Sequence, residues 1–442
     1  MSNKVKEKTV RPAAKPALVP KLRFPQFRDA GGWDNKPMDQ LYSFKGTNSL
    51  SRDKLDYTGG SVKNIHYGDI HTKFSQLFDI RGEDVPFIIP AESIEKANAD
   101  DYCVETDVVF ADASEDLEDI GKCIELVELN GQRLLSGSHT ILARQKHNNL
   151  AVGFGGHLFH ATRIRAQIKK EAQGAKVFGI SPSRLSRIEI CYPSDKKEQK
   201  KIADCLSSLD ELITLEARKR DTLKAHKKGL MQQLFPAEGE TVPKLRFPEF
   251  RDAGEWILKT ISSVCKTYSG GTPATTQKDF YGGDIPFIRS AEIDKENTEL
   301  FLTPEGLSNS AAKIVSKGDV LVALYGANSG DVALARIDGA INQAILCLKS
   351  ENSNAFIYQY LFHIKNWLIS TYIQGGQGNL SGEIVKSIEL GFPKPEEQQR
   401  IADCLSSLDD LITLEAQKLD TLRALKKGLM QQLFPALDEV QG

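Results

Sequence analysis

One segment of this chain occurs twice, and this duplication limits the folds that the chain can adopt. Residues 198–236 and 397–435 are identical at 32 of 39 positions. A shorter pair of copies, at 19–33 and 242–256, precedes two long inserts that differ in length and sequence. Internal repeats of this kind indicate one architecture that is used twice. We therefore expect two domains on a duplicated frame, each presenting a different surface.

The long repeated segment has the periodicity of a helix. Its apolar residues recur at alternating spacings of three and four, which are the a and d positions of a coiled coil. Pro193 and Pro393 stand just before the two segments, and Pro236 and Pro435 end them, because proline cannot continue a helix. The expected seam consists of Ile202, Leu206, Leu209, Ile213, Leu223, Leu230 and Leu234, and of Ile401, Leu405, Leu408, Ile412, Leu419, Leu422, Leu429 and Leu433.

Charged residues on this seam favour an antiparallel pair within the chain. Each helix places one glutamate and one lysine there, namely Glu216 with Lys227 and Glu415 with Lys426. In an antiparallel pair Glu216 approaches the Lys426 end, and Lys227 approaches the Glu415 end. Unlike charges then meet, whereas a parallel pair in register sets like charges together. Two matched helices in one chain also pair at a high effective concentration. The alternative is a plain coiled coil that joins two chains.

The repeats and the prolines divide the chain into seven segments. We expect a disordered tail at 1–18, because this stretch is rich in Lys and Pro, and a short tail at 437–442. The other expected segments are a first insert domain at 19–194, a helix at 195–236, a linker that repeats the N-terminal segment at 237–255, a second insert domain at 256–394 and a second helix at 395–436.

Both inserts have the alternation of short apolar runs and turns that is typical of mixed α/β domains. The runs 319–324 and 340–348 are predicted strands bounded by Gly, Asn and Asp, and 355–369 is a predicted core helix. Asp84–Ile88 matches Asp284–Ile288, which indicates a shared fold with divergent loops. The expected fold class is α+β, with two mixed α/β domains joined by two long helices in an intramolecular antiparallel coiled coil with pseudo-twofold symmetry.

Polar residues on turns and glycine-flanked loops are the candidate ligand-binding residues. Glycine lets the backbone approach a ligand, and polar side chains can hydrogen-bond the edges of bases. The candidates in the first insert are Arg52, Lys63, His66, Tyr67, Ser138, His139 and Arg184. Those in the second insert are Thr272, Tyr325, Asn328, Ser329, Gln377 and Asn379. Taken alone, such residues are more often ordinary surface turns.

The sequence lacks the motifs of several functional classes. It has no GxxxxGK[ST] phosphate loop, no Asn-Pro-Pro-Tyr/Phe run of the amino-methyltransferases, and no Cys or His spacing suited to zinc. We therefore predict no catalytic and no metal-ligating residues. No apolar run is long enough to span a bilayer, and the N-terminal stretch lacks the apolar core of a secretory signal. These features predict a cytoplasmic protein that has no membrane partner.

Several motifs, taken with the repeated helices, resemble the specificity (S) subunit of Type I restriction–modification enzymes. The resemblance covers nearly the whole chain, in the order insert, helix, insert, helix. It rests on Ser-Gly-Gly-Thr-Pro at 269–273, Gly-Gly-Asp-Ile-Pro-Phe-Ile at 282–288, Gly-Asp-Val-Leu at 318–321, Gly-Asn-Leu-Ser at 378–381, and Pro-Glu-Glu-Gln-Gln-Arg-Ile-Ala at 395–402 with its copy at 198–203. The first insert has no counterpart of the Ser-Gly-Gly-Thr-Pro loop.

The resemblance implies a non-catalytic, sequence-specific DNA-binding subunit. Each insert would be a target-recognition domain that reads one half of a bipartite site in double-stranded DNA. The helices would hold two methyltransferase subunits, and motor-nuclease subunits would join for restriction. S-adenosylmethionine, ATP and Mg would then be bound by the partner subunits, with no cofactor on this chain.

Two alternatives stay open from the sequence alone. The formal net charge of −2 argues against a strong stand-alone DNA binder, because phosphate contacts need clustered Lys and Arg. Local clusters or partner subunits could supply that charge. One alternative is a pseudo-symmetric coiled-coil adaptor that binds proteins without recognising DNA. The other is an enzyme with an unrecognised site, which would need a pocket with convergent titratable groups.

Overall fold

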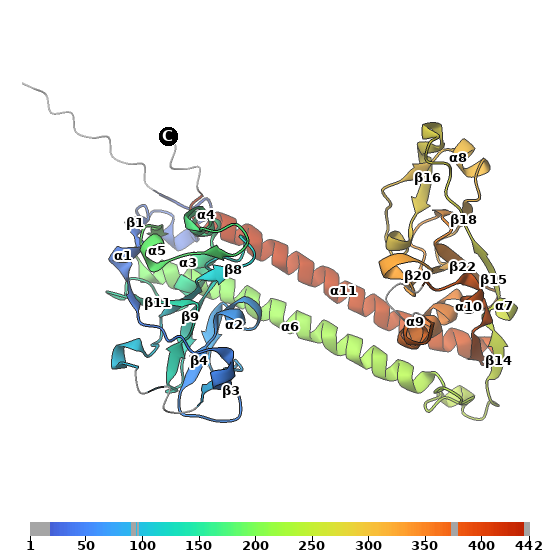
Figure 1. Ribbon diagram of the computed structural model, residues 1–442, viewed down its shortest axis with the longest axis horizontal. Helices are drawn as coiled ribbons and strands as arrows, with labels where there is room; N and C mark the ends of the chain where they lie inside the picture. The colour runs from blue at the N-terminus through green and yellow to red at the C-terminus, as the bar shows by residue number, and fades with distance from the viewer. Residues whose placement is uncertain (1–17, 90–93, 95–96, 373–378, 437–442) are drawn as a thin grey trace, which may run out of the picture. The chain divides into compact units, whose positions relative to one another are not determined.

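The chain folds into two compact units in a computed structural model that describes residues 18–89, 94, 97–372 and 379–436. Unit 1 comprises residues 1–215 and 419–442, and unit 2 comprises residues 216–418. Each unit holds one insert and part of each long helix (Figure 1). Among the described residues, no helix is both long enough and apolar enough to cross a membrane.

The two long helices predicted from the repeat are present. Helix α6 spans Lys196–Leu234 and helix α11 spans Pro395–Leu433, each with 39 residues. Pro236 and Pro435 follow their last turns, and a proline there cannot continue the backbone hydrogen-bond pattern. The repeated sequence therefore forms the repeated element that its periodicity predicts.

Within unit 1, the start of α6 packs against the end of α11. Ile202 and Leu206 lie in one buried core with Leu433 and Phe434. Farther along, the ammonium of Lys426 donates to both carboxylate oxygens of Asp210, at 2.5 and 2.7 Å. Residue numbers rise along α6 while they fall along α11, so the helices are antiparallel in this unit.

Within unit 2, the end of α6 packs against the start of α11 in the same way. Phe235 lies in one core with Ile401 and Leu405. The ammonium of Lys227 donates to both oxygens of Asp409, at 2.6 and 2.7 Å. The predicted antiparallel orientation is therefore confirmed in each unit by its own packing and its own ion pair.

The predicted partners of the seam charges are wrong. Both seam lysines pair with aspartates, whereas Glu216 accepts from Lys418 and Glu415 pairs with Lys219. The reason is the helix register, which brings Glu216 about level with Lys418, eight positions before Lys426. The seam still joins unlike charges, but through residues that the heptad pattern alone did not select.

Every residue of the expected seam is buried or half-buried. The buried ones are Ile202, Leu206, Leu234, Ile401, Leu405, Leu419 and Leu433. The half-buried ones are Leu209, Ile213, Leu223, Leu230, Leu408, Ile412, Leu422 and Leu429. Leu212, Leu215, Leu411 and Leu414 stay exposed, so each helix keeps apolar side chains outside the seam.

Unit 1 is built on a five-stranded sheet with the order β2-β11-β7-β9-β5, of which Figure 1 labels β9 and β11. These strands are β2 (Tyr42–Lys45), β5 (Leu77–Asp79), β7 (Val108–Ala111), β9 (Cys123–Glu128) and β11 (Thr140–Gln145). A second sheet, ordered β10-β4-β6-β3, contains β3 (Leu55–Asp56), β4 (Lys63–Ile65), β6 (Phe87–Ile88) and β10 (Leu134–Ser136). Two strand pairs are β1 (Asp34–Pro37) with β13 (Glu189–Tyr192), and β8 (Ala113–Ser114) with β12 (Phe178–Gly179). Its short helices are α1 (Met38–Leu41), α2 (Tyr67–Thr72), α3 (Phe154–His160), α4 (Thr162–Glu171) and α5 (Pro182–Leu185).

Unit 2 repeats this plan with fewer strands. Its central sheet has the order β15-β22-β19-β20, with β15 (Cys265–Ser269), β19 (Val320–Ala323), β20 (Val332–Leu334) and β22 (Ile345–Ser350). The second sheet, ordered β17-β16-β21-β18, contains β16 (Tyr281–Ile288), β17 (Phe301–Leu302), β18 (Lys313–Val315) and β21 (Gly339–Ile341). Strand β14 (Ile257–Thr260) pairs with β23 (Glu389–Phe392). Its helices are α7 (Ile261–Val264), α8 (Pro304–Ser308), α9 (Asn354–Tyr372) and α10 (Gly382–Ser387).

The central strands of the two units correspond, which confirms the prediction of a shared fold with divergent loops. The order β2-β11-β7 in unit 1 matches β15-β22-β19 in unit 2, and all of these pairs are antiparallel. The predicted helix at 355–369 is α9, and the predicted strand at 319–324 is β19. The prediction of a single strand at 340–348 is wrong. The chain turns at Asn342, whose side-chain oxygen accepts from the N–H of Ala344 at 3.0 Å. This turn places β21 and β22 in different sheets.

The short N-terminal repeats fasten the start of each long helix. The guanidinium of Arg23 donates to both carboxylate oxygens of Glu198, at 2.7 Å each. Arg246 does the same to Glu397, at 2.7 and 2.8 Å. These side chains are at most 8% exposed, and such bidentate pairs are short and directional. The shorter pair of copies, at 19–33 and 242–256, therefore supplies one buried ion pair to the start of each long helix. We call this ion pair the ionic clamp of its unit.

Candidate nucleic-acid interface

Three candidate residues of unit 1 bring their rings together beside the central sheet. His66 follows β4 and caps α2, Tyr67 begins that helix, and His139 precedes β11. The ring centres of His66 and Tyr67 are 4.8 Å apart, and those of Tyr67 and His139 are 5.3 Å apart. Two segments that are distant in the sequence thus form one small aromatic surface.

The backbone at His139 holds an uncommon conformation. Its φ of +58° lies in the left-handed region, which residues other than glycine seldom adopt. Its Nδ1 lies 3.2 Å from a carboxylate oxygen of Asp112, which directly follows β7. Strained residues of this kind concentrate at functional sites, and the imidazole of this one is exposed.

Arg52 is fixed next to this aromatic surface by a buried carboxylate. Its guanidinium donates to both oxygens of Asp69, at 2.9 and 3.0 Å, while half of its own side chain stays exposed. Burial, and then the charge of Arg52, lower the pKa of His66. The Nδ1 of His66 accepts from the N–H of Gly68 at 3.1 Å, so a neutral His66 carries its proton on Nε2.

These groups have the donors that DNA recognition requires. A guanidinium has five N–H donors, of which Asp69 takes two from Arg52. The others, and the Nε2–H of His66, can donate to the guanine acceptors of a major groove or to phosphate oxygens.

Two of the candidates in the first insert do not join this cluster. The ammonium of Lys63 lies 5.3 Å from the ring centre of Phe87 on the second sheet. Arg184 donates to the backbone oxygen of Glu171 at the end of α4, at 3.0 Å. Ser138 is half-buried beside His139. The structure therefore gives Lys63 and Arg184 intramolecular partners that account for their positions without a ligand.

In unit 2, backbone hydrogen bonds join the glycine-flanked loops into one surface. Leu324 donates to the oxygen of Ala344 at 2.8 Å and accepts from Leu380 at 2.9 Å. Gly270 donates to the oxygen of Asn342 at 3.2 Å. A Cβ at Gly270 would lie 1.7 Å from the oxygen of Ile341, so only glycine allows this approach.

Some candidate side chains of unit 2 are exposed to solvent, whereas others bond to neighbouring loops. Tyr325 is 39% exposed, and Asn379 is exposed as well. The hydroxyl of Thr272 donates to Gln343 at 2.7 Å, and Asn328 is half-exposed. The Ser329 hydroxyl instead donates to the oxygen of Leu324 at 2.9 Å and accepts from the N–H of Leu380 at 3.2 Å, so it holds two loops together. Gln377 lies outside the described residues.

The two candidate surfaces occupy the same edge of corresponding sheets. Ile180 donates to the oxygen of Asp112 at 2.8 Å in unit 1, just as Leu380 donates to that of Leu324 in unit 2. Asp112 and Leu324 each follow the third strand in the order of their sheet, β7 and β19. A repeated scaffold therefore presents loops of unlike sequence at equivalent positions.

Sequence reasoning missed three polar residues at these surfaces. Gln343 supports Thr272, His71 packs at 6.3 Å from Tyr67, and Lys73 lies 3.8 Å from Asp69. A signal for Gln343 was available, because it precedes β22 as Ser138 and His139 precede β11. His71 and Lys73 follow from the helical spacing of α2, which is visible only once that short helix is known.

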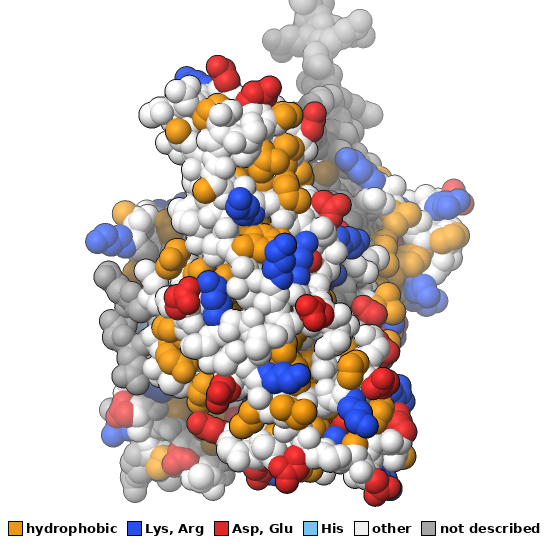
Figure 2. Space-filling view, turned by 90° about the vertical axis from the view of Figure 1, so that its right-hand side faces the viewer, with side chains coloured by type: hydrophobic (Ala, Val, Ile, Leu, Met, Phe, Trp, Pro, Cys, Tyr) orange, Lys and Arg blue, Asp and Glu red, His pale blue; other side chains and the backbone are white. Residues whose placement is uncertain are grey.

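Charge is mixed on the face of the molecule shown in Figure 2, which lies on the side of β14 and α7. Lys and Arg side chains alternate there with Asp and Glu, and no continuous basic strip appears on that face. Among the described residues, no group of three or more His, Cys, Asp or Glu side chains could hold a metal ion. On that one face, therefore, Lys and Arg side chains do not gather into a basic patch.

Both halves of the chain match one family of DNA-specificity domains. Residues 74–225 and 253–424 each match the family described as the Type I restriction modification DNA specificity domain. The chain belongs to this family. It is a specificity subunit of a type I restriction–modification system, with two DNA specificity domains. The matched family is named for DNA specificity rather than for a catalytic activity, which favours DNA recognition over the adaptor and enzyme alternatives.

Similar proteins include other specificity subunits. A Methanocaldococcus jannaschii protein, provisionally named as the specificity subunit of the type I restriction enzyme MjaX, is 26% identical over 400 residues, which cover 88% of each chain. The specificity subunit of EcoR124I/EcoR124II from Escherichia coli is 23% identical over 52% of this chain and 57% of its own length. The S subunit from M. genitalium shares the fold, with a TM-score of 0.62 and 15% identity over 95% of this chain and all of that one.

Proposed function

We propose that this specificity subunit reads a bipartite site in double-stranded DNA, with one half-site recognised by each unit. The observation that carries this proposal is the repeated frame with unlike loops at the same sheet edge. Unit 1 offers Arg52, His66 and His139, whereas unit 2 offers neutral donors and acceptors such as Tyr325 and Asn328. Because the chemistry differs, the two units select different bases.

Catalysis in this proposal belongs to partner subunits. Two methyltransferase subunits bind the long helices, whose exposed residues Leu212, Leu215, Leu411 and Leu414 supply apolar contact area, and motor-nuclease subunits join for restriction. S-adenosylmethionine, ATP and Mg bind to those partners, and the assembly works on DNA in the cytoplasm. The formal net charge of −2 supports this division, because partner subunits would supply much of the phosphate contact.

Alanine substitutions in unit 2 separate base contacts from loop supports. We expect Tyr325→Ala and Asn328→Ala each to reduce discrimination between cognate and mismatched DNA by about 1–3 kcal/mol, the value of a good base contact. Ser329→Ala should instead destabilise the loop, because its hydroxyl joins the backbones of Leu324 and Leu380. The measurement is competition binding by the assembled methyltransferase complex to duplexes with single substitutions.

The matched control is Asn309→Ala, an exposed residue at the end of α8 whose amide bonds within its own helix. It should leave discrimination unchanged. Unchanged discrimination in both Tyr325→Ala and Asn328→Ala would show that these loops do not read bases.

A further inference from the structure

The two units differ at the surface formed by their corresponding strand pairs, β1 with β13 and β14 with β23. Because the frame is duplicated, similar side chains would be expected there. In unit 2 the paired strands β14 and β23 expose Ile257 and Leu258, at 63% and 55%, and α9 exposes Trp367 at 37%. The strand registers correspond, because Leu258 faces Gly391 as Asn35 faces Cys191 in unit 1. Three apolar side chains therefore mark a surface of unit 2. In unit 1 the register places Asp34 and Asn35 at the positions of Ile257 and Leu258, and Gln167 of α4 contacts Glu189, the counterpart of Glu389.

In unit 1, Asn35 and Gln167 both hydrogen-bond to Glu189. Gln167 accepts from the backbone N–H of Glu189 at 2.7 Å and donates to its oxygen at 3.0 Å. Asn35 donates to the Glu189 carboxylate at 2.7 Å. Leu258 has no hydrogen-bonding side-chain group, and the indole of Trp367 can donate but not accept, so the two cannot reproduce these bonds at Glu389, the counterpart of Glu189. The apolar residues of unit 2 thus replace a closed polar network.

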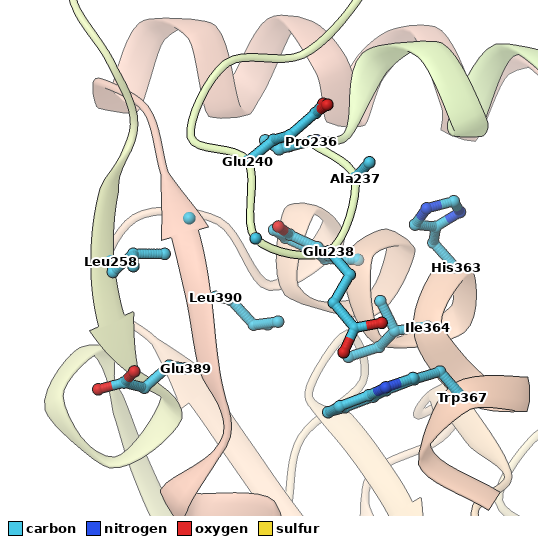
Figure 3. Close-up of a pocket in the computed structure, with 13 residues that line it drawn as sticks. Pro236, Ala237, Glu238, Glu240, Leu258, His363, Ile364, Trp367, Glu389 and Leu390 are labelled. Carbon is cyan, nitrogen blue, oxygen red and sulfur yellow. The ribbon is translucent and has the colours of Figure 1, made fainter. Parts of the chain in front are cut away.

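A cavity of about 300 Å³ opens at this surface, beneath the turn that follows α6 (Figure 3). The turn is closed by a hydrogen bond from Glu240 to the oxygen of Ala237 at 2.9 Å, and Gly239 has a φ of +81° that favours glycine. The lining residues include Leu258, Ile364, Trp367 and Leu390. The volume is at the small end of ligand pockets, suited to one inserted side chain.

The cavity combines this apolar lining with negative charge. Three carboxylates line it, those of Glu238, Glu240 and Glu389, and none of the described lining residues is Lys or Arg. Figure 3 shows the Glu238 carboxylate near Ile364 and the Trp367 ring. His363 stacks on Phe235 with ring centres 5.3 Å apart, and burial lowers its pKa, so it adds no charge near neutral pH.

We propose that this cavity is a docking site for a protein other than this chain, which inserts an arginine or lysine side chain flanked by apolar residues. The cation lies over the face of Trp367 and bonds to Glu238. The flanking residues cover Ile257 and Leu258, which are otherwise exposed. Because the described part of unit 1 has a polar network at the equivalent positions, one such partner binds per chain. This inference does not depend on which DNA sequence the loops read.

Trp367 provides the signal for the test. The chain has three tryptophans, and the other two, Trp33 and Trp256, are only 5% and 2% exposed. The full chain is titrated with the blocked peptide acetyl-Leu-Arg-Leu-amide and with its neutral citrulline analogue, while tryptophan emission is recorded. We expect the arginine peptide to bind roughly tenfold more tightly, because it adds one charge-assisted interaction.

Two variants and one control complete the experiment. Trp367→Phe should remove the emission change, and Glu238→Gln should lower the affinity for the arginine peptide roughly tenfold while leaving citrulline binding unchanged. Glu296→Gln, which alters an exposed carboxylate elsewhere in unit 2, should have no effect. Equal affinity for the two peptides, or no emission change at about 10 mM peptide, overturns the proposal. Self-association of the chain that Trp367→Asp abolishes would assign the surface to a second copy and overturns it too.

Discussion

Replacing Arg23 with alanine is expected to lower the free energy of unfolding of unit 1 by about 3–5 kcal/mol, because the substitution leaves a buried carboxylate without its cation. Glu198 is 1% exposed and receives two hydrogen bonds from Arg23. Trp33 also donates to Glu198, over a longer distance of 3.4 Å from its Nε1. Native-state hydrogen exchange, read peptide by peptide, measures the change in unit 1 while unit 2 serves as an internal reference.

The control for this prediction is Arg28→Ala, which removes an exposed arginine of the same repeat and should change stability by less than about 0.5 kcal/mol. Arg246→Ala should reproduce the large loss in unit 2, where Glu397 is the buried partner. Exposed ion pairs contribute less than about 1 kcal/mol to stability. If both alanine variants lowered the free energy of unfolding by less than this, the claim that the buried pairs stabilise the two units would be wrong.

Exchanging the second insert is expected to change one half of the recognised DNA and leave the other half intact. Residues 256–393 are replaced by the corresponding segment of a relative with a different target, so that unit 1 and both long helices are kept. The preference for the original second half-site should fall by about 10³-fold or more. This is the usual ratio between the affinity of such a protein for its specific site and its affinity for non-specific DNA. Selection of bound duplexes from a randomised pool, with the assembled complex, measures it.

The reciprocal exchange of residues 34–192 is the matched control, and it should change only the other half. If either exchange altered both half-sites, the units would not read DNA independently. If neither exchange altered the selected sequence, recognition would lie outside the inserts.

The helices and their orientation could be predicted because their signals are local and repeated. A sustained three-and-four spacing over 39 residues specifies α6 and α11, and the seam charges favour the antiparallel choice although their predicted partners are wrong. The exact ion pairs could not be predicted, because a shift of a few positions in register exchanges Glu for Asp as the partner of Lys227. Packing in the domain cores, where Phe235 and Phe434 insert, sets that register.

The candidate surfaces could be predicted only as loops that carry suitable side chains. Their assembly depends on bonds between distant segments, such as Leu380 to Leu324 and Thr272 to Gln343, and a sequence pattern does not contain these. The same limit explains Ser329, whose polar side chain supports the loops instead of facing solvent. It also explains Arg184, whose bond to Glu171 depends on how α4 packs.

The most direct test of the central claim is a genome-wide map of adenine methylation, read by single-molecule sequencing, in a host that carries the complete system. If each unit reads its own half-site, the methylated positions will fall in one bipartite sequence, with two short defined blocks separated by bases of any identity. Deleting the gene for this chain should abolish that methylation. A single uninterrupted methylated motif, or methylation that persists without this chain, would contradict the account.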